Sequence, residues 1–145
     1  MNIYIANDHG GYDLKLAVES YLKEQGVEYV DFGCDGEKVD YPDIAVKVCE
    51  KVVNGECDKG ILVCGTGIGM SMCANKINGI RAAVCGDTFS AKYTRLHNNA
   101  NVLCMGGRVI GAGLACEIVH EFLTNEFEGG RHIARLDKMK NLEGK

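Results

Sequence analysis

The sequence predicts an α/β fold built on a doubly wound, five-stranded parallel sheet. Three observations predict it. Five short β-prone runs alternate with stretches of helical periodicity along the whole chain. One of these runs, residues 60–64, is apolar throughout, as expected for a strand that helices cover on both faces. The 145 residues suffice for one domain, and neither a repeat nor a linker divides them.

The first half of the chain contains three strands and the helices that connect them. The β-prone residues 2–6 end in a polar loop, after which apolar residues recur at helical spacing. Gly26 stands where a helix C-cap is expected, and a second strand follows at residues 27–32. Pro42 suits the first turn of the next helix, where a missing N–H leaves nothing unpaired. The third strand, residues 60–64, leads into a glycine-rich loop and another helix.

The second half of the chain continues the same alternation. Residues 81–85 and 101–105 are two more β-prone runs, and residues 89–96 between them have helical spacing. Residues 114–123 form a strongly amphipathic helix, and the charged segment 129–145 is expected to contain a final helix. Parallel strands joined in this way require right-handed crossovers, so helices are expected on both faces of the sheet.

The composition excludes several classes of function. Lys and Arg total 16 and Asp and Glu total 20, which gives a net charge of −4 and no general basic field to hold nucleic acid. No stretch approaches the roughly 20 uninterrupted apolar residues of a membrane span. The first residues lack the basic and apolar regions of a signal peptide, so a cytoplasmic location is expected.

Most of the eight cysteines are expected to be buried small hydrophobic residues. A reducing cytoplasm disfavours disulfides, and no two cysteines have the spacing of a zinc site or a dithiol motif, so no metal site is predicted. Cys64 differs because it ends a buried strand and faces a helix N-terminus, a setting that favours the reactive thiolate. It is therefore a candidate base or nucleophile, with a purely structural role as the alternative.

Polar loops at the carboxyl ends of the strands are the expected place for a ligand in such a sheet. Asp8 and His9 follow the first strand, and Cys64 ends the third. His97 and Asn98 precede the fifth strand, which places them at its amino end unless the preceding helix reaches over the site. Both histidines stand beside groups able to orient an imidazole for acid–base chemistry, although a lone surface histidine usually has no function.

Gly65, Gly67 and Gly69 lie in a loop that departs from both the dinucleotide fingerprint and the Walker loop. Three glycines in so short a loop let the backbone approach a ligand closely. The N–H groups at the following helix start can then hold a phosphate or an oxyanion. A tight strand-to-helix turn is the alternative. Thr66 and Ser71 supply hydroxyl groups that either contact a ligand or cap the helix.

Positive charge is concentrated at a few places in this acidic chain. Arg131 and Arg135, four residues apart, would share one helix face and form a fork for a phosphate monoester. A solvated C-terminal helix is the alternative. Arg108 stands among glycines directly after the fifth strand. These positions favour a small anion as the ligand.

These motifs together resemble the sugar-phosphate isomerase family that contains ribose-5-phosphate isomerase B and the galactose-6-phosphate isomerase subunits. Their number and order make the resemblance specific, and they span nearly the whole chain. They are Asn7–Gly11, Asp40–Pro42, Cys64–Gly69, Ala74–Lys76, Gly79–Ala82, His97–Asn98, Gly106–Val109 and Gly129–His132.

The resemblance implies a single domain over residues 1–145 with a Rossmann-like α/β/α sandwich. It also implies cofactor-free interconversion of an aldose phosphate and a ketose phosphate, with ribose 5-phosphate and ribulose 5-phosphate of the pentose phosphate pathway as the leading pair. The expected assembly is a homodimer or a dimer of dimers whose sites are shared between subunits, with residues 129–145 packing on a partner subunit.

The resemblance further implies catalytic roles for named residues. A thiolate at Cys64 would move a proton between C1 and C2 of the sugar through an enediolate, with Thr66 assisting beside it. Other members use a glutamate at the place of Met70, so this chain resembles the cysteine type. His97 would open the furanose ring with the help of Asp8. No metal takes part in this scheme.

The same resemblance implies a set of substrate contacts. Backbone N–H groups of residues 65–71 would stabilise the enediolate, side chains would line the sugar pocket, and four basic residues would surround the phosphate. Cys73 matches no catalytic position. The expected contacts are His9, Tyr41, Gly65, Gly67, Ile68, Gly69, Ser71, Asn98, Arg108, Arg131 and Arg135.

Three alternatives remain open from the sequence. The substrate could instead be a six-carbon sugar phosphate such as galactose 6-phosphate or allose 6-phosphate, because pocket depth decides between them. A non-catalytic nucleotide- or phosphate-binding module could be built on the same fold. A redox sensor would require a reactive thiol whose oxidation switches a partner interaction.

Overall fold

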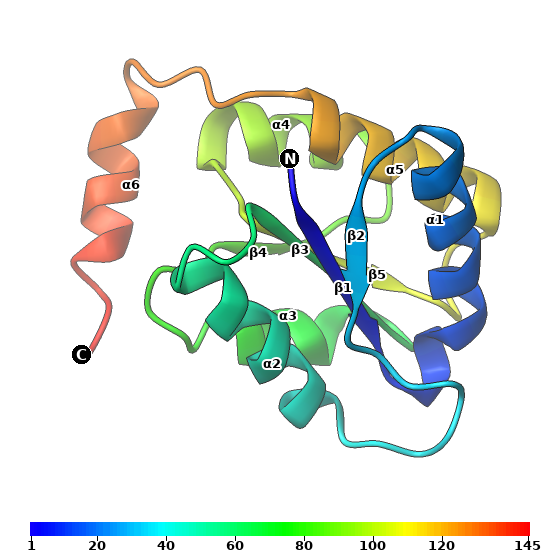
Figure 1. Cartoon of the computed structure of the whole chain (residues 1–145). Coiled ribbons are helices and arrows are strands. Elements are labelled where there is room, and N and C mark those ends of the chain that lie inside the picture. The colour runs from blue at the N-terminus through cyan, green and yellow to red at the C-terminus, as the bar shows by residue number, and fades with distance from the viewer.

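The structure, a computed structural model, describes residues 1–145 and contains the predicted alternation of strands and helices (Figure 1). The strands are β1 (Ile3–Asn7), β2 (Tyr29–Asp31), β3 (Lys59–Cys64), β4 (Ala82–Val84) and β5 (Val102–Gly106). The helices are α1 (Tyr12–Glu24), α2 (Tyr41–Val53), α3 (Ile68–Ala74), α4 (Thr88–Asn98), α5 (Ala112–Thr124) and α6 (His132–Lys140), with a 3-10 turn, η1 (His9–Gly11), before α1.

The five strands form one sheet in the order β2-β1-β3-β5-β4, and every neighbouring pair is parallel. The predicted five-stranded parallel sheet is therefore confirmed. The chain turns back at the β1/β3 boundary, since β2 lies on one side of β1 and the later strands lie on the other. The loops that leave the carboxyl ends of β1 and β3 consequently diverge there, which is where such sheets bind ligands.

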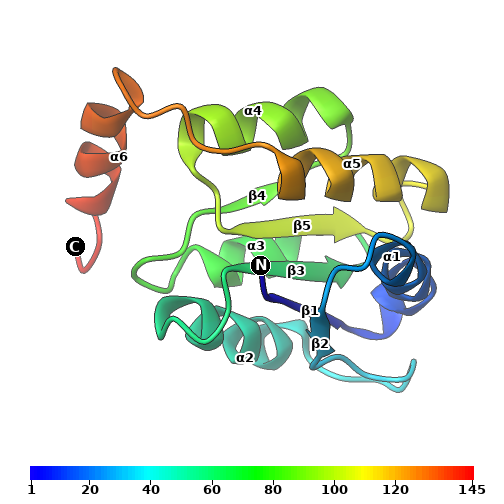
Figure 2. The same ribbon diagram turned by 45° about the horizontal axis from the view of Figure 1, so that its top comes forward.

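Helices cover both faces of the sheet (Figures 1 and 2). One core of 17 buried residues lies between the sheet and α1, α4 and α5, and a second core of 12 lies between the sheet and α2 and α3. Strand β3 serves both, because Ile61 and Val63 belong to the first core whereas Leu62 and Cys64 belong to the second. This double coverage explains why residues 60–64 are apolar without alternation.

The two edge strands are shorter than the sequence predicts. Strand β2 comprises residues 29–31 rather than 27–32, and β4 comprises 82–84 rather than 81–85. Each has a hydrogen-bonded neighbour on one side only, so nothing extends the ladder beyond the residues that pair with β1 or β5.

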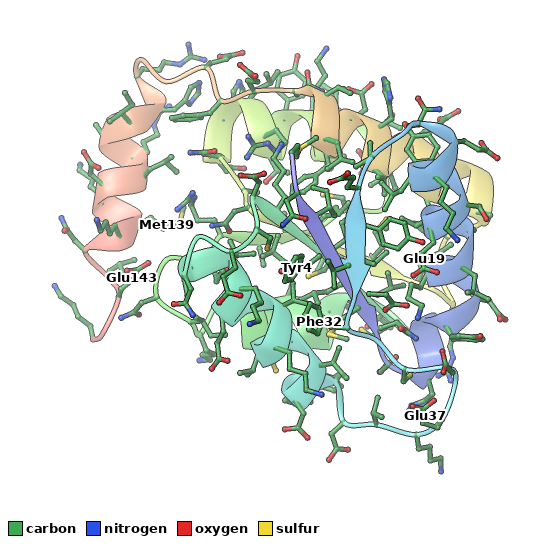
Figure 3. The ribbon with its side chains drawn as sticks, in the orientation of Figure 1. Tyr4, Glu19, Phe32, Glu37, Met139 and Glu143 are labelled. Atoms are coloured by element: carbon green, nitrogen blue, oxygen red, sulfur yellow. The ribbon has the colours of Figure 1, made fainter.

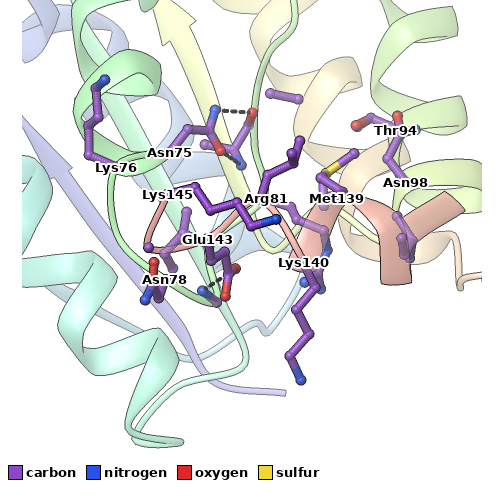
Figure 4. A pocket seen from close by; sticks show the side chains of 18 residues that line it. Asn75, Lys76, Asn78, Arg81, Thr94, Asn98, Met139, Lys140, Glu143 and Lys145 are labelled. Atoms are coloured by element: carbon purple, nitrogen blue, oxygen red, sulfur yellow. Dashed lines mark hydrogen bonds between the residues drawn. The ribbon is translucent and has the colours of Figure 1, made fainter.

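Helix α6 stands apart from the two helical layers, beyond the amino ends of the strands (Figure 2). Only His132 of this helix is buried, and Ile133 and Met139 are about half exposed. A cavity of about 760 Å³ separates α6 and the C-terminal residues from residues 75–83. Met139 and Lys140 border this cavity, and Glu143 crosses it to accept the Gly79 N–H at 2.8 Å (Figure 4). No helix has the length and apolar character needed to span a membrane.

Candidate active site

The loops that follow β1, β3 and β5 are packed into one unit at the carboxyl edge of the sheet. The N–H of Gly107 donates to the Cys64 carbonyl at 2.7 Å, and the N–H of Asp8 donates to the Val63 carbonyl at 3.1 Å. A Cβ at position 107 would lie 2.5 Å from the carbonyl oxygen of Gly10, so only glycine allows this approach. The glycine-rich loops therefore hold the candidate catalytic residues close together.

Cys64 is held beneath the start of α3. Its side chain is buried, and its Sγ accepts a hydrogen bond from the Gly67 N–H at 3.1 Å. Gly67 has a left-handed φ of +81°, and a Cβ there would lie 2.9 Å from the backbone carbon of Met105. Glycine at this position thus aims an N–H at the sulfur, and a donor of this kind stabilises a thiolate more than a thiol.

The N–H groups of residues 65–71 divide into two sets. Those of Gly67, Ile68 and Ser71 already donate within the protein, to Cys64 Sγ at 3.1 Å, Thr66 Oγ1 at 3.2 Å and the Gly67 carbonyl at 3.2 Å. The Ser71 hydroxyl is also engaged, because it donates to the Ile68 carbonyl at 2.8 Å. The N–H groups without an acceptor in the protein are those of Gly65, Thr66, Gly69 and Met70. This set is narrower than the whole loop that the sequence suggests.

Four other predicted residues lie around this loop. Asp8 is buried, and its Oδ1 accepts the Gly10 N–H at 2.9 Å as the N-cap of η1. Tyr41 packs on the start of α3, because a Cβ at Gly69 would lie 2.6 Å from Tyr41 Cζ. The side chain of Arg108 lies beside Gly65. His9 is exposed and lines a cavity of about 670 Å³ with Asp40, Asp43 and Lys47, among others.

A buried polar network connects the backbone of Asp8 to Lys15 and Asp31. The sequence analysis did not predict this network. Asn7 Nδ2 donates to the Asp8 carbonyl at 2.8 Å, while Asn7 Oδ1 accepts the Cys34 N–H at 3.2 Å. Lys15 Nζ donates to the Cys34 carbonyl at 3.1 Å and to Asp31 Oδ2 at 2.8 Å. The sequence signal that could have indicated it is Lys15, a charged residue next to Leu14 on the buried side of α1.

The surroundings of Lys15 shift the pKa values of two carboxyl groups in opposite directions. Burial acts to raise the pKa of Asp31, but hydrogen bonds from Lys15 and the Gly33 N–H outweigh it and lower that pKa. Glu19, on α1 (Figure 3), is half-buried, and this burial together with hydrogen bonding to Asp31 raises its pKa to about 7. The network therefore contains one carboxylate that stays charged and one carboxyl group that titrates near neutrality.

The remaining predicted site residues lie at the other end of the sheet. His97 and Asn98 end α4, which leads into the amino end of β5, and Arg131 and Arg135 belong to the α6 segment (Figure 2). Within one chain the fold does not bring these four residues to Cys64. The possibility that α4 reaches over the carboxyl edge in the same chain is therefore wrong, because the helix runs from the carboxyl edge to the amino edge.

His97 belongs to a cluster that the sequence did not indicate. Its ring stacks on that of His132, with centroids 4.2 Å apart and planes 18° apart. Glu128 Oε2 lies 3.8 Å from His97 Nε2 and 3.6 Å from His132 Nε2. Burial, with the charges of His97 and Arg131, lowers the pKa of His132. The spacing of Glu128 and His132, four residues apart across two glycines, was the only sequence signal.

The cysteines bear out their predicted structural role. Six are buried, and Cys73 and Cys116 are half-buried, and none forms a disulfide. Burial raises the pKa of Cys49 and that of Cys85 to about 12, so neither thiol is reactive near neutral pH. These two thiols therefore do not support the redox-sensor alternative.

The sequence profile of the ribose/galactose isomerase family matches residues 3–139. The chain belongs to this family. It is therefore a sugar-phosphate isomerase, and the resemblance found in the motifs is confirmed. This isomerase is similar to the solved structure of ribose-5-phosphate isomerase B from Clostridium thermocellum, with 51% identity, a TM-score of 0.96 and coverage of 98% of this chain and 97% of the other. The Rossmann-like α/β/α sandwich is confirmed with it.

Two further relatives differ in what their names state. Ribose-5-phosphate isomerase B from Mycoplasma genitalium, solved with bound ribulose 5-phosphate, is 43% identical with a TM-score of 0.91, over 97% of this isomerase and 94% of that chain. A D-erythrulose-4-phosphate isomerase from Pectobacterium atrosepticum is 45% identical over 145 residues, which are 99% of this isomerase and 95% of the relative. Family membership therefore leaves the length of the sugar open.

Proposed function

We propose that this isomerase interconverts D-ribose 5-phosphate and D-ribulose 5-phosphate without a cofactor, with Cys64 as the base. The observation that carries the proposal is the Cys64 sulfur, which accepts the Gly67 N–H at 3.1 Å beside a loop in which four other N–H groups, those of Gly65, Thr66, Gly69 and Met70, are free. The substrate is chosen because similar chains carry this activity in their names, one of them with ribulose 5-phosphate bound.

In the proposed reaction the Cys64 thiolate removes the proton from C2 of the open-chain aldose. The electron pair moves into the C1–C2 bond, and the C1 carbonyl oxygen becomes the oxyanion of an enediolate. Return of the proton to C1, with transfer of the O2 proton to the O1 oxyanion, yields the ketose. The free N–H groups of Gly65, Thr66, Gly69 and Met70 are candidate donors to the oxyanion, and each well-placed donor contributes about 3–4 kcal/mol.

The complete site requires a second copy of the chain. One protomer supplies Cys64 and the carboxyl-edge loops, and its partner supplies the ring-opening histidine from the opposite edge of the sheet. The exposed apolar residues of α6, Ile133 and Met139, support this arrangement, because a helix with one buried residue needs another surface to pack on. Residues 129–145 would thereby pack on the partner subunit in a homodimer or a dimer of dimers.

The phosphate would be held where the two edges meet. His9 and Arg108 lie at the carboxyl edge, and Arg131 and Arg135 come from the partner's α6 segment. The guanidinium groups can form charge-assisted hydrogen bonds with a phosphate dianion. Tyr41, packed on Gly69, and the partner's Asn98 would then border the sugar.

A different sugar length is the alternative that the relatives favour most directly. The 45% identical D-erythrulose-4-phosphate isomerase supports a four-carbon substrate, and the family description includes galactose, which supports a six-carbon substrate. The deciding experiment compares kcat/KM for four-, five- and six-carbon aldose and ketose phosphates without added metal. A preference for another length would overturn the ribose assignment but leave the isomerase chemistry in place.

The role of Cys64 has a matched test within the chain. Cys64→Ala should abolish ketose formation from ribose 5-phosphate, whereas Cys73→Ala, in the neighbouring helix, should leave it unchanged. Solvent deuterium should appear in sugar phosphate recovered from the wild type but not from Cys64→Ala. Absence of deuterium from the wild-type product mixture, together with tight nucleotide binding, would favour the non-catalytic binding module.

A further inference from the structure

The chain contains one group of three side chains able to ligate a metal ion, and it lies at the amino edge of the sheet. His97 ends α4, Glu128 precedes α6 and His132 begins it. Their ligand atoms all lie within 4.8 Å of one another, and the carboxylate oxygen stands between the two Nε2 atoms at 3.8 and 3.6 Å. No other three His, Cys, Asp or Glu side chains in the chain are placed in this way.

One of these ligand atoms has no hydrogen-bond partner. His132 is 5% exposed, and its Nε2 is shielded from solvent and makes no hydrogen bond, although it faces Glu128. A buried polar atom left without a hydrogen bond destabilises the folded state. A metal ion bound between the three side chains would remove that destabilisation, because it would take the lone pair of the nitrogen.

We propose that His97, Glu128 and His132 bind a divalent transition-metal ion of the Zn²⁺ type, and that the ion inhibits the isomerase. Two imidazoles and one carboxylate are a donor set that Zn²⁺ and similar borderline ions accept, with water in the fourth position. Mg²⁺ and Ca²⁺ prefer oxygen ligands and are not expected to bind there. The inhibition rests on the proposed function, because it requires His97 to act in ring opening.

The geometry explains why binding would inhibit. Tetrahedral zinc holds its donor atoms about 3.3 Å apart, so the two nitrogen–oxygen separations need to close by only a few tenths of an ångström. The metal must also lie near the plane of each ring, yet the two rings are stacked 18° apart. One ring must therefore turn. His97, whose side chain is 34% exposed, is free to do so, and it would leave the position that ring opening needs.

The neighbouring charges limit the affinity. Arg131 and Arg135 are close enough to act on His132, and both oppose a dication. Glu128 supplies the only negative charge among the three ligands. We therefore expect a dissociation constant on the order of micromolar rather than nanomolar, with removal of the ion by a chelator restoring activity.

Binding can be measured without any assay of activity. In a Zn²⁺ titration followed by NMR of the imidazole groups, the signals of His97 and His132 should shift and those of His9 and His120 should not. The visible spectrum of added Co²⁺ should show a tetrahedral complex without the strong near-ultraviolet band of thiolate ligation. Equal shifts at all four histidines, or a thiolate band, would overturn the assignment.

A pair of isosteric variants then connects binding to inhibition. Glu128→Gln should weaken Zn²⁺ binding, and raise the concentration for half-inhibition, by about tenfold or more. Glu126→Gln removes the same charge from the same segment and should change neither. An active wild type that Zn²⁺ neither binds at these residues nor inhibits would refute the inference. Zn²⁺ binding at these residues in a wild type without isomerase activity would instead refute the proposed function and leave the site standing.

Discussion

The N–H of Gly67 donates to the sulfur of Cys64 across 3.1 Å, and the left-handed φ of Gly67 places it there. Backbone rather than a side chain supports the candidate base, so substitution of the glycine disturbs the base directly. Gly67 also packs against the backbone of Met105 in β5, which leaves the loop no room to retreat. Any side chain at position 67 should therefore disturb both the base and the packing on β5.

Gly67→Ala should lower kcat by roughly 100-fold, because it displaces a donor at the reacting sulfur. An alanine in a left-handed conformation costs about 1–2 kcal/mol. The loss of stability should exceed this value, because the new Cβ would lie 2.9 Å from the backbone carbon of Met105. Gly55→Ala is the matched control: Gly55 has φ of +77° with nothing within 4 Å. Steady-state kinetics and urea unfolding of both variants provide the test, and equal losses of stability would contradict the packing argument.

Gly69→Ala should act through Tyr41. The new Cβ would lie 2.6 Å from the tyrosine ring, which is partly exposed and can swing away. We expect KM to rise by about tenfold with a smaller change in kcat, and Tyr41→Ala to do the same alone. The double variant should then be little worse than either single variant, because both remove one contact. Additive effects in this cycle would show that the two residues act separately.

Lys15→Met should destabilise the protein by about 3 kcal/mol, near the lower end for breaking a buried ion pair, because Asp31 is one-third exposed. The same change at Lys51, whose pair with Glu56 is on the surface, should have no measurable effect on stability. Loss of Lys15 should also lower kcat/KM, since the network behind Asp8 runs through Cys34 and Asn7. Unchanged activity in a folded Lys15→Met protein would show that this network does not support catalysis.

Glu19 should make stability fall as the pH rises from about 4.5 to 7. Its pKa is raised from 4.5 to about 7 in the folded state, so the folded protein holds a proton that the unfolded chain has released. The contribution is fully present below pH 4.5 and is lost by the time the pH exceeds 7. Asp31, whose pKa is lowered from 3.8, changes the free energy of unfolding only below about that pH.

Glu19→Gln mimics the protonated form and should remove this pH dependence. The urea midpoint of the variant should exceed that of the wild type by an amount that grows between pH 5 and pH 7.5. Glu24→Gln, at the exposed end of the same helix, should follow the wild type. Parallel curves for wild type and Glu19→Gln would show that Glu19 titrates normally.

The fold could be predicted because the central strand is buried on both faces and is therefore apolar throughout. Residues 60–64 face two separate cores, and an uninterrupted apolar run is the only pattern that satisfies both. The edge strands were overestimated since apolar residues such as Val27 pack beside the sheet without joining its ladder. The carboxyl-edge half of the site was also predictable, because parallel strands bring their following loops to one edge.

The half of the site at the amino edge of the sheet could not be predicted from the pattern of one chain. His97 lies at the opposite edge from Cys64, so its proposed use depends on an assembly that strand and helix patterns do not encode. Glu128 and His132 come together through the turn at Gly129 and Gly130, both of which have positive φ. No periodicity marks such a turn, and the stacking of His132 on His97 depends on it.

The shared site can be tested directly by mixing two inactive variants. Cys64→Ala and His97→Gln are each expected to have little activity as pure proteins. If each site combines Cys64 of one chain with the partner's His97, half of the dimers in a randomised mixture are hybrids with one intact site. Such a mixture, refolded together from urea with ribose 5-phosphate as substrate, should recover about one quarter of wild-type activity. No recovery, with hybrid dimers demonstrated by differential tagging, would contradict the shared active site.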